Sequence, residues 1–181
     1  MDGGVDGDGL PPTFDLETRG GEFMAWIPTV TWDSVKAKLQ SIFAVFALKG
    51  ITNISIIGFC WGAWVAMRAA ADFEGIFKAA CCAHPAIHLE QYAYGGDLVA
   101  LGSKVTIPVL LLPAGNDPEI YSEEGAFTVE LKKNNAKSAT TSEYKDMKHG
   151  FLPRGDLSDT AVASKVTQAL NEMCEFICAN N

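Results

Sequence analysis

The strongest constraint on the fold is a turn at residues 58–62, which joins an apolar strand to an apolar helix. Residues 51–57 are rich in β-branched side chains and predict a strand that ends at Gly58. Residues 61–73 are apolar on nearly all sides, which predicts a buried central helix. The turn reads G-F-C-W-G, with a glycine two residues before and two residues after Cys60. We expect it to hold Cys60 in strained geometry, with both glycines avoiding collisions with neighbouring backbone.

The remainder of the chain alternates helices with strands. Apolar periodicity and capping signals predict helices over 33–49, 123–134 and 158–179 and strands over 77–83, 109–112 and 139–144. The first of these helices is expected to begin at Asp33 or Ser34 and to stop at Gly50. The last strand is the least apolar, so we expect it nearer an edge of the sheet. Such alternation implies right-handed crossovers and a mostly parallel sheet covered on both faces, which is a three-layer α/β fold.

A chain of 181 residues is long enough for one domain with a sizeable core. Residues 1–12 are mostly Gly, Asp and Pro, and we expect a loose lead-in before a domain at 13–181. The formal charge of −8 argues against nucleic acid as a partner, because no basic stripe can neutralise phosphates. No apolar run is long enough to span a bilayer, and no signal peptide pattern is present, so no membrane partner is expected. The five cysteines match no zinc or Cys-x-x-Cys spacing, which favours a reducing, cytoplasmic location.

Three polar residues stand after strands, where ligands of α/β sheets bind. Cys60 begins the buried helix, whose dipole favours a thiolate, and the backbone N–H of Trp61 can meet an oxyanion. Asp117 follows the third predicted strand, and His149 follows the fourth. Taken singly, each fits a simpler role: a structural cysteine, a turn former before proline and a loop histidine. Together, the order nucleophile, acid and histidine after successive strands predicts a catalytic triad.

The motif G-F-C-W-G, Asp117 after P-A-G-N, and His149-Gly-Phe with Arg154 behind it resemble the dienelactone hydrolase (carboxymethylenebutenolidase-like) family. The resemblance extends over most of the chain, including residues 22–26. It implies an α/β-hydrolase fold that needs no cofactor and hydrolyses small-molecule lactones or esters through a thioester intermediate. It further implies that Cys60 is the nucleophile, that His149 is the general base and then acid, and that Asp117 orients the imidazole.

The same resemblance suggests contacts with the substrate. Arg154 stands where family members often carry an arginine that binds a substrate carboxylate, which would imply a carboxylate-bearing substrate. The alternative for Arg154 is a solvated surface charge. Phe59 and Phe151 are expected to line an apolar pocket, whereas Trp64 is expected to pack in the core.

The chain departs from the family pattern before the elbow. Family members carry several more strands there, whereas 50 residues precede Ile51 and contain one clear helix. The second oxyanion N–H and the carboxylate near the thiol therefore have no counterpart. The strand before Cys60 is expected to be an exposed sheet edge, which favours a homodimer or poor solubility. Alternatives to an enzyme are a hydrolase remnant that serves as a binding or interaction module and a redox-reactive thiol protein.

The other histidines and cysteines are assigned no catalytic role. His84 and His88 lie near the adjacent cysteines 81 and 82, which raises the question of a metal site. Successive residues of a strand point to opposite faces, so the two thiols cannot converge on one ion, and no metal site is expected. Cys174 and Cys178, four residues apart on the last helix, are expected to be small core residues.

Overall fold

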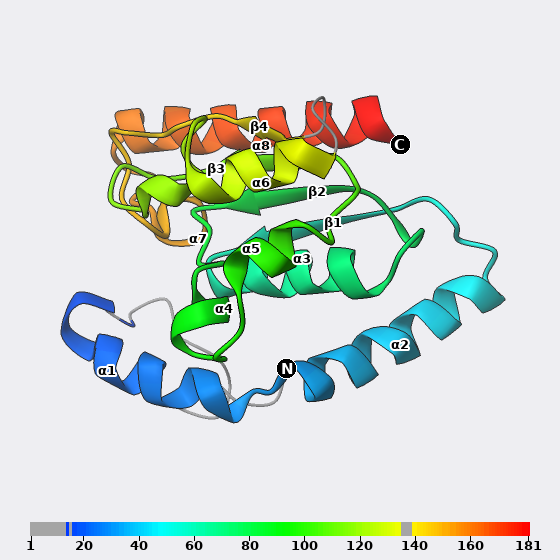
Figure 1. Ribbon diagram of the computed structural model, residues 1–181. Helices are drawn as coiled ribbons and strands as arrows, with labels where there is room; N and C mark the ends of the chain where they lie inside the picture. Colours follow the sequence, from blue (N-terminus) through cyan, green and yellow to red (C-terminus); the bar gives the residue numbers. More distant parts are fainter. Residues whose placement is uncertain (1–13, 15, 135–138) are drawn as a thin grey trace.

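A parallel sheet of four strands lies at the centre of the fold (Figure 1). The computed structural model describes residue 14 and residues 16–134 and 139–181. The strands are β1 (Ile54–Phe59), β2 (Phe77–Ala83), β3 (Val109–Leu112) and β4 (Ala139–Thr141). They follow one another across the sheet in chain order, and each neighbouring pair is parallel. The predicted α/β class is confirmed.

Helices flank this sheet and extend beyond it. They are α1 (Leu16–Trp26), α2 (Trp32–Leu48), α3 (Trp61–Asp72), α4 (Leu89–Tyr92), α5 (Leu98–Gly102), α6 (Ala126–Asn134), α7 (Phe151–Arg154) and α8 (Thr160–Asn180), with short 3-10 helices η1 (Ile27–Thr29) and η2 (Glu119–Tyr121). In Figure 1, α8 runs along one side of the sheet and α3 along the other, and α1 and α2 lie beyond α3. Within the described ranges, none of the helices has the length and apolarity that a membrane crossing requires.

The three layers follow from the alternation of side chains along the buried strands. In β2, Ala80 and Cys82 face a core that is shared with α3 and α6. Cys81 and Ala83 face a second core that is shared with α7 and α8. All four side chains are fully buried. Both faces of β2 are therefore covered, and the two adjacent cysteines point apart as the sequence predicted.

The C-terminal end of α2 explains why β1 begins later than predicted. Gly50 adopts a left-handed φ of 68°, and the N–H of Ile51 donates to the carbonyl of Phe46 at 2.9 Å. This six-to-one bond belongs to a Schellman motif, which closes the helix. Ile51 is therefore part of the helix end, and the strand starts at Ile54 instead.

Other boundaries also differ from the sequence-based ones. Thr31, and not Asp33 or Ser34, is the N-cap of α2, and its hydroxyl oxygen accepts from the N–H of Ser34. The helix predicted from 123 begins at Ala126, the strand predicted to 144 ends at Thr141, and the last helix runs from Thr160 to Asn180. The helical form of residues 16–26 was not expected, because two glycines interrupt its sequence. The lead-in predicted over residues 1–12 lies outside the described residues.

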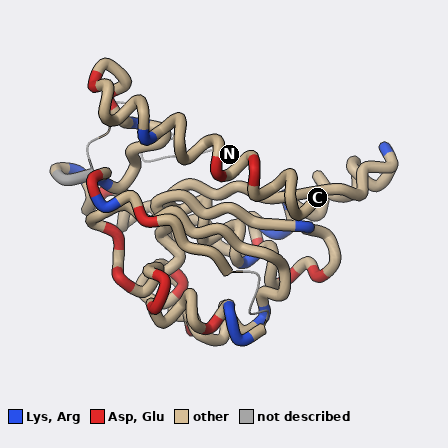
Figure 2. Tube along the Cα trace, turned by 90° about the horizontal axis from the view of Figure 1, so that it is seen from above, with Lys and Arg blue, Asp and Glu red and all other residues tan. Residues whose placement is uncertain are grey.

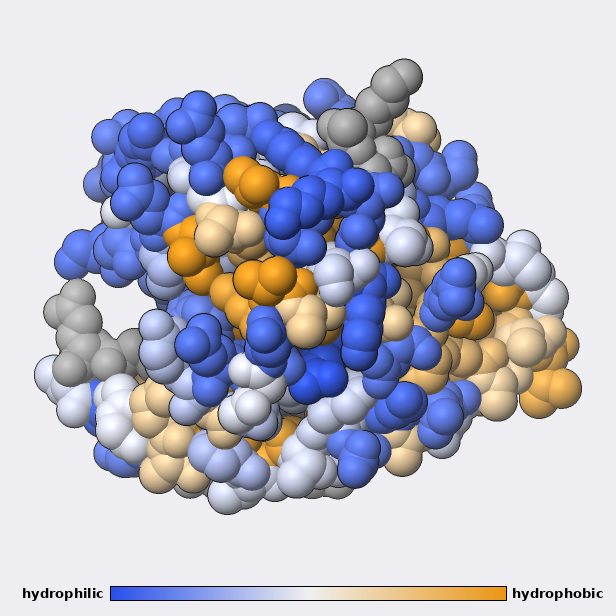
Figure 3. Space-filling model, in the orientation of Figure 1, coloured by the Kyte–Doolittle hydropathy of each residue, from blue (hydrophilic) through white to orange (hydrophobic). Residues whose placement is uncertain are grey.

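β1 lies at one edge of the sheet, as the sequence predicted. Ile57 and Phe59 of this strand are 44% and 38% exposed, because α8 covers the middle strands rather than the edge. The start of α2 is fastened to α3, where Trp32 Nε1 donates to Asp72 at 2.8 Å. Near its other end Leu48 is 88% exposed, and Figure 3 shows apolar surface on that side of the molecule. The edge strand and the end of α2 thus leave apolar side chains in solvent.

Candidate active site

The turn after β1 has the strained geometry that the sequence predicted. Cys60 adopts φ 51° and ψ −121°, a region that side-chain-bearing residues rarely occupy, and it caps α3. A Cβ on Gly58 would lie 2.3 Å from the carbonyl oxygen of Gly62. Glycine is therefore required at position 58, since any side chain would collide with the backbone of the first helical turn.

The same expectation is wrong for Gly62. A Cβ built on this residue meets no described atom within 4 Å. Gly62 lies in the first turn of α3, and its absent side chain would point into open space rather than toward β1. Of the two glycines in the turn, only Gly58 therefore has to lack a side chain to avoid a collision with neighbouring backbone.

Asp117 is held in a tight turn directly after β3. One carboxylate oxygen accepts from the N–H of Ala114 at 2.7 Å, and the Asp117 N–H donates to the Ala114 carbonyl at 3.0 Å. The neighbouring Gly115 donates its N–H to Met147 in the loop after β4, and a Cβ at position 115 would collide with the Lys145 carbonyl. The two loops are therefore in direct backbone contact. This contact brings the carboxylate of Asp117 to the histidine on the other loop.

His149 links Asp117 to Cys60. Its Nδ1 lies 2.5 Å from Oδ1 of Asp117, and its backbone N–H donates to Asn116 Oδ1 at 2.6 Å. Burial lowers the pKa of His149, but hydrogen bonds with Asp117 and with Cys60 outweigh burial and raise it to about 10. The Asp117 side chain is only 2% exposed, so its charge is little screened. The structure thus brings together the three residues that the sequence nominated as a triad.

Trp61, the predicted oxyanion donor, is the first residue of α3. An N–H in the first turn of a helix has no acceptor within the helix and is available to a ligand. Its indole Nε1 donates to the Tyr94 hydroxyl at 2.8 Å, and that hydroxyl donates to the carbonyl of Ile27 at 3.1 Å. The Trp61 ring also meets the ring of Trp26 edge-on at 5.7 Å. Trp61 therefore joins the elbow to the N-terminal helices.

The three predicted substrate-contact residues occupy different surroundings. Phe151 is 5% exposed and stacks on Tyr144 at 5.1 Å, so it offers little surface to a ligand. Phe59 is partly exposed on the edge strand. Arg154 donates to the carbonyl of Phe14 at 2.7 Å, and with His149 and Phe151 it borders a hollow of about 340 Å³. Phe59 is not among the residues that border this hollow.

His84 is a site residue that sequence reasoning missed. It follows β2 directly, has a φ of 35°, is fully buried, and neither ring nitrogen has a partner among the described residues. Its ring lies 4.9 Å from that of His149 and 6.0 Å from that of Phe59. Burial, with a smaller contribution from His149, lowers its pKa to about 4, so it is neutral at physiological pH. Its position at a strand end, next to a proline, was the signal available in the sequence.

A cleft of about 440 Å³ opens beside the triad. Phe23 and Met24 of α1 contribute an apolar wall, and no sequence signal predicted that they lie here. The other residues that border the cleft come from the segment after β2 and from the two loops that carry the predicted triad: Ala86, His88, Leu89, Asn116, Asp117, Pro118, Lys148 and His149. The cleft therefore combines apolar side chains with a few hydrogen-bonding groups, as small-molecule sites commonly do.

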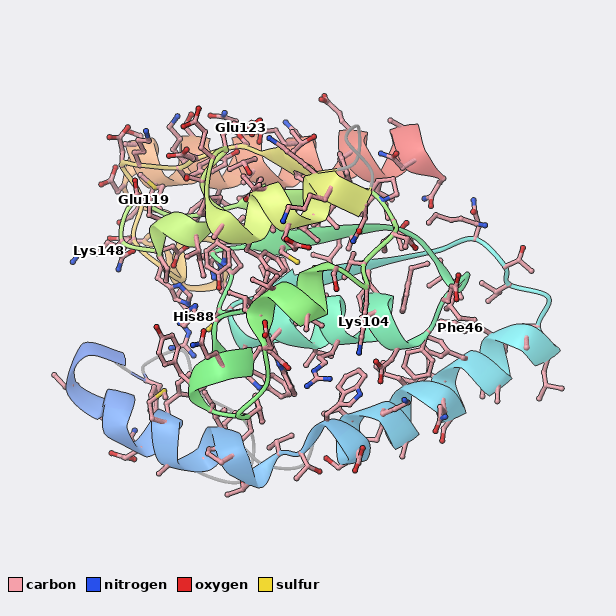
Figure 4. All side chains as sticks on the ribbon, in the orientation of Figure 1. Phe46, His88, Lys104, Glu119, Glu123 and Lys148 are labelled. Atoms are coloured by element: carbon pink, nitrogen blue, oxygen red, sulfur yellow. The ribbon has the colours of Figure 1, made fainter. Side chains whose placement is uncertain are left out.

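A second hollow, of about 660 Å³, lies on another side of Asp117 and is rich in carboxylates, including Glu119, Glu123 and Glu143. Figure 2 shows acidic and basic positions scattered around the outside of the molecule, without a single basic face in this view. Figure 4 places Glu119 and Glu123 toward α6 and α8, apart from His88. An anionic ligand is disfavoured at this hollow, because the carboxylates would repel it.

The five cysteines differ clearly in their surroundings. Cys81 and Cys82 are fully buried, and burial raises the pKa of both thiols, that of Cys81 to about 12. Cys174 and Cys178 are exposed, so the expectation that they are core residues is wrong. The stripe of α8 that enters the core consists of other residues, among them Val166, Ala169 and Met173.

Only Cys60 combines partial exposure with an interacting histidine among the described residues. Within the same residues, no group of three or more His, Cys, Asp or Glu side chains could hold a metal ion.

Comparisons with known proteins agree with this fold. The sequence model of the Dienelactone hydrolase family matches residues 21–180. Among solved structures, the acylaminoacyl peptidase of Pyrococcus horikoshii (orthorhombic crystal form) is similar with a TM-score of 0.55 and 17% identity, over 76% of this chain and 26% of the peptidase chain. That likeness supports the α/β-hydrolase fold alone, and no curated protein sequence matches significantly. With a family match over nearly its whole length, this chain belongs to the dienelactone hydrolase family of hydrolases.

Proposed function

We propose that this chain is a cysteine-dependent hydrolase of lactones or small esters that works through a thioester intermediate. The observation that carries the proposal is the convergence of the three residues: Nδ1 of His149 lies 2.5 Å from Oδ1 of Asp117, and interactions with Asp117 and Cys60 raise the pKa of the same imidazole. Membership in a hydrolase family supports the reaction class. The strained position of Cys60 at the N-terminus of α3 supports its role as the nucleophile.

The reaction would proceed in two halves. In the first, Sγ of Cys60 forms a bond to the acyl carbon, the bond between that carbon and the alcohol oxygen breaks, and Nε2 of His149 gives its proton to the leaving oxygen. In the second, a water molecule loses a proton to His149 and attacks the thioester. The carbon–sulfur bond then breaks, which releases a carboxylic acid and returns the thiolate. A lactone would yield a single hydroxy acid.

The electrostatics of His149 favour its role as a proton donor. The raised pKa of His149 means that the Asp117 carboxylate and Cys60 stabilise the imidazolium form. Because Nδ1 faces Asp117, the other ring nitrogen is the one that can serve the thiol and the leaving group. The N–H of Trp61 would stabilise the oxyanion formed during each half.

A carboxylate on the substrate would be bound by Arg154. One of its guanidinium N–H groups is directed to the Phe14 carbonyl, and a guanidinium has five such donors in all. Arg154 and His149 border the same hollow, which places a cation close to the proposed acyl site. Phe59 would contact the substrate from the edge strand, where its ring is partly exposed.

The proposal is tested by hydrolysis of 4-nitrophenyl acetate with the purified chain and with Cys60→Ala and His149→Ala. We expect each variant to lose about 10³-fold or more in kcat/KM, because nucleophile and base act as a unit. Cys174→Ala is the matched control, since this thiol is exposed and lies on α8. Mass spectrometry after an acid quench is expected to find the acetyl group on Cys60. Equal rates in all four proteins would overturn the proposal.

One observation favours a second candidate, a hydrolase-like binding module. Residues 16–53 form helices and loops, and no strand precedes β1 among them, so the loop that supplies the second oxyanion N–H in this fold has no counterpart there. Loss of one such donor reduces the rate by about 10²–10³-fold. A chain that binds lactones but shows neither turnover nor an acyl-Cys60 species would favour the binding module.

A further inference from the structure

The cleft beside the triad contains a histidine that the proposed reaction does not use. We propose that His88 determines specificity at this site by donating its Nε2–H to an acceptor oxygen on the alcohol part of the substrate. This inference rests on the proposed ester or lactone hydrolysis. It deepens that function by naming the substrate class, which is an apolar alcohol that carries a carbonyl, ether or similar oxygen.

The protonation of the His88 ring follows from its contact with Tyr121. The Tyr121 side chain is fully buried, and its oxygen accepts from the backbone N–H group of His88 at 2.7 Å. Nδ1 of His88 lies 2.8 Å from the same oxygen. Among the described residues, Nδ1 is the only acceptor within hydrogen-bonding distance of this buried hydroxyl, so the O–H of Tyr121 donates to Nδ1. The ring proton of neutral His88 is therefore on Nε2.

The ring is also held in the neutral state. Burial lowers the pKa of His88, and this effect outweighs the opposite effect of the Asp117 charge, while His149 adds to the lowering. At neutral pH His88 is thus a donor without charge. A neutral donor is suited to an uncharged acceptor such as a carbonyl or ether oxygen. The ammonium of Lys148, which borders the same cleft, is instead a strongly hydrated point charge.

The position of His88 is fixed relative to the nucleophile. His88 precedes α4, and Glu90 of that helix is buried and accepts from Trp64 Nε1 at 2.7 Å and from Arg68 Nε at 2.8 Å. Trp64 and Arg68 both belong to α3, the helix that Cys60 caps. Supports of this kind hold a binding group within the narrow range of positions that discrimination requires.

The alcohol side of the substrate has to lie in this cleft. His149 must protonate the leaving oxygen, so the alcohol part projects from the His149 side of the acyl carbon. His88 and His149 both border the cleft, together with Phe23 and Met24. Figure 4 shows His88 and Lys148 on the side of the molecule where α1 and α4 lie. An alcohol with an apolar body and one acceptor oxygen would contact the α1 wall with its body and His88 with its oxygen.

The first test measures binding without catalysis. Two phenols of similar shape and acidity, 4-hydroxyacetophenone and 4-(trifluoromethyl)phenol, are titrated by NMR into the full chain, His88→Leu, His88→Gln and Gln91→Leu. We expect the chain and Gln91→Leu, a control on the exposed side of the same helix, to prefer the ketone by about threefold to tenfold, as one neutral hydrogen bond allows. His88→Leu is expected to lose this preference, and His88→Gln, which keeps a donor, to retain part of it. A preference that survives in His88→Leu, or that is absent in the chain itself, would overturn the proposal.

Two further measurements separate this inference from the proposed function. The acetate esters of the same phenols are compared by kcat/KM, and we expect the ratio between them to fall toward one in His88→Leu. If neither ester is hydrolysed, the proposed function fails, while the binding preference still decides the role of His88. The ¹⁵N spectrum of the ring is expected to show a proton on Nε2 in the chain, and a mixture of tautomers in Tyr121→Phe. A proton on Nδ1 in the chain would overturn the inference.

Discussion

Nδ1 of His149 lies 2.5 Å from Oδ1 of Asp117, although the two residues follow different strands and are separated by 31 intervening positions. The contact depends on the backbone junction between Gly115 and Met147, which joins the loops after β3 and β4. It fixes the tautomer of His149 and directs its other nitrogen toward Cys60. The carboxylate therefore controls the ring that the proposed chemistry uses.

Asp117→Asn is expected to lower kcat for 4-nitrophenyl acetate by about 10²–10⁴-fold, because an amide can hold the ring in the wrong tautomer. Steady-state kinetics at about neutral pH check this prediction, because the raised pKa of His149 keeps the imidazole charged there in the parent chain. Asp33→Asn is the matched control, since Asp33 is exposed in the first turn of α2. A variant with parental kcat would show that Asp117 does not orient the histidine.

The stability of the chain is expected to decrease as the pH rises from 6.5 to 10. The folded pKa of His149 is about 10 and its ordinary value is 6.5, so the stabilisation is complete below 6.5 and is lost through 10. Urea unfolding across this range measures the free energy of unfolding. His149→Gln is expected to give a flatter curve, and an unchanged slope in this variant would contradict the assignment.

The opposite sign applies to His84. Its folded pKa of about 4 lies below its ordinary value of 6.5, so the unfolded chain binds the extra proton between these values. The free energy of unfolding should therefore fall as the pH is lowered from 6.5 to 4. His84→Leu is expected to reduce this dependence in urea unfolding experiments, with a residual slope from His88, whose pKa is also lowered. Identical slopes in both proteins would rule out His84 as the source.

The two glycines of the elbow are expected to respond differently to alanine. Gly58→Ala forces a Cβ against the backbone of Gly62 and should destabilise the chain by about 1–3 kcal/mol. Gly62→Ala has open space in a helix and should stabilise it by about 0.5–1 kcal/mol. Thermal unfolding of the pair is a direct comparison. Equal losses in both variants would mean that the tight approach is symmetric.

We propose that the exposed edge of β1 pairs with a second copy of this chain. Unpaired backbone groups of an edge strand can extend a sheet, and Ile57 on this strand is 44% exposed. Light scattering is expected to show a dimer whose population rises with concentration. Ile57→Lys should weaken it, whereas Val99→Lys on α5 should not. A monodisperse monomer at all concentrations would refute the pairing.

The sheet and the convergence of Cys60, Asp117 and His149 could be predicted because their signals are local. Cys60 directly follows a strand with a strong apolar pattern, Asp117 and His149 lie in the loops after β3 and β4, and strand ends of a parallel sheet meet at one edge. The burial of His84 could not be predicted in this way, because it depends on Phe59 of β1 and on His149 and Phe151 from the segment after β4.

Residues 16–26 could not be placed because tertiary contacts override their propensity. Gly20 and Gly21 disfavour a helix, yet the segment is helical and is held by Trp26 against Trp61. Cys174 and Cys178 were misassigned for a related reason. Their spacing suits a buried stripe, but the face that α8 turns to the sheet is set by Val166, Ala169 and Met173.

The position of β1 gives the site a weakness that the two middle strands of the sheet do not share. This strand has one hydrogen-bonded neighbour among the described residues, whereas β2 and β3 each have two. Peeling β1 away from β2 would separate Cys60 from His149 and leave β2, β3 and β4 assembled. Heat inactivation is thus expected to begin below the temperature at which the core melts, because the nucleophile is carried by an edge strand.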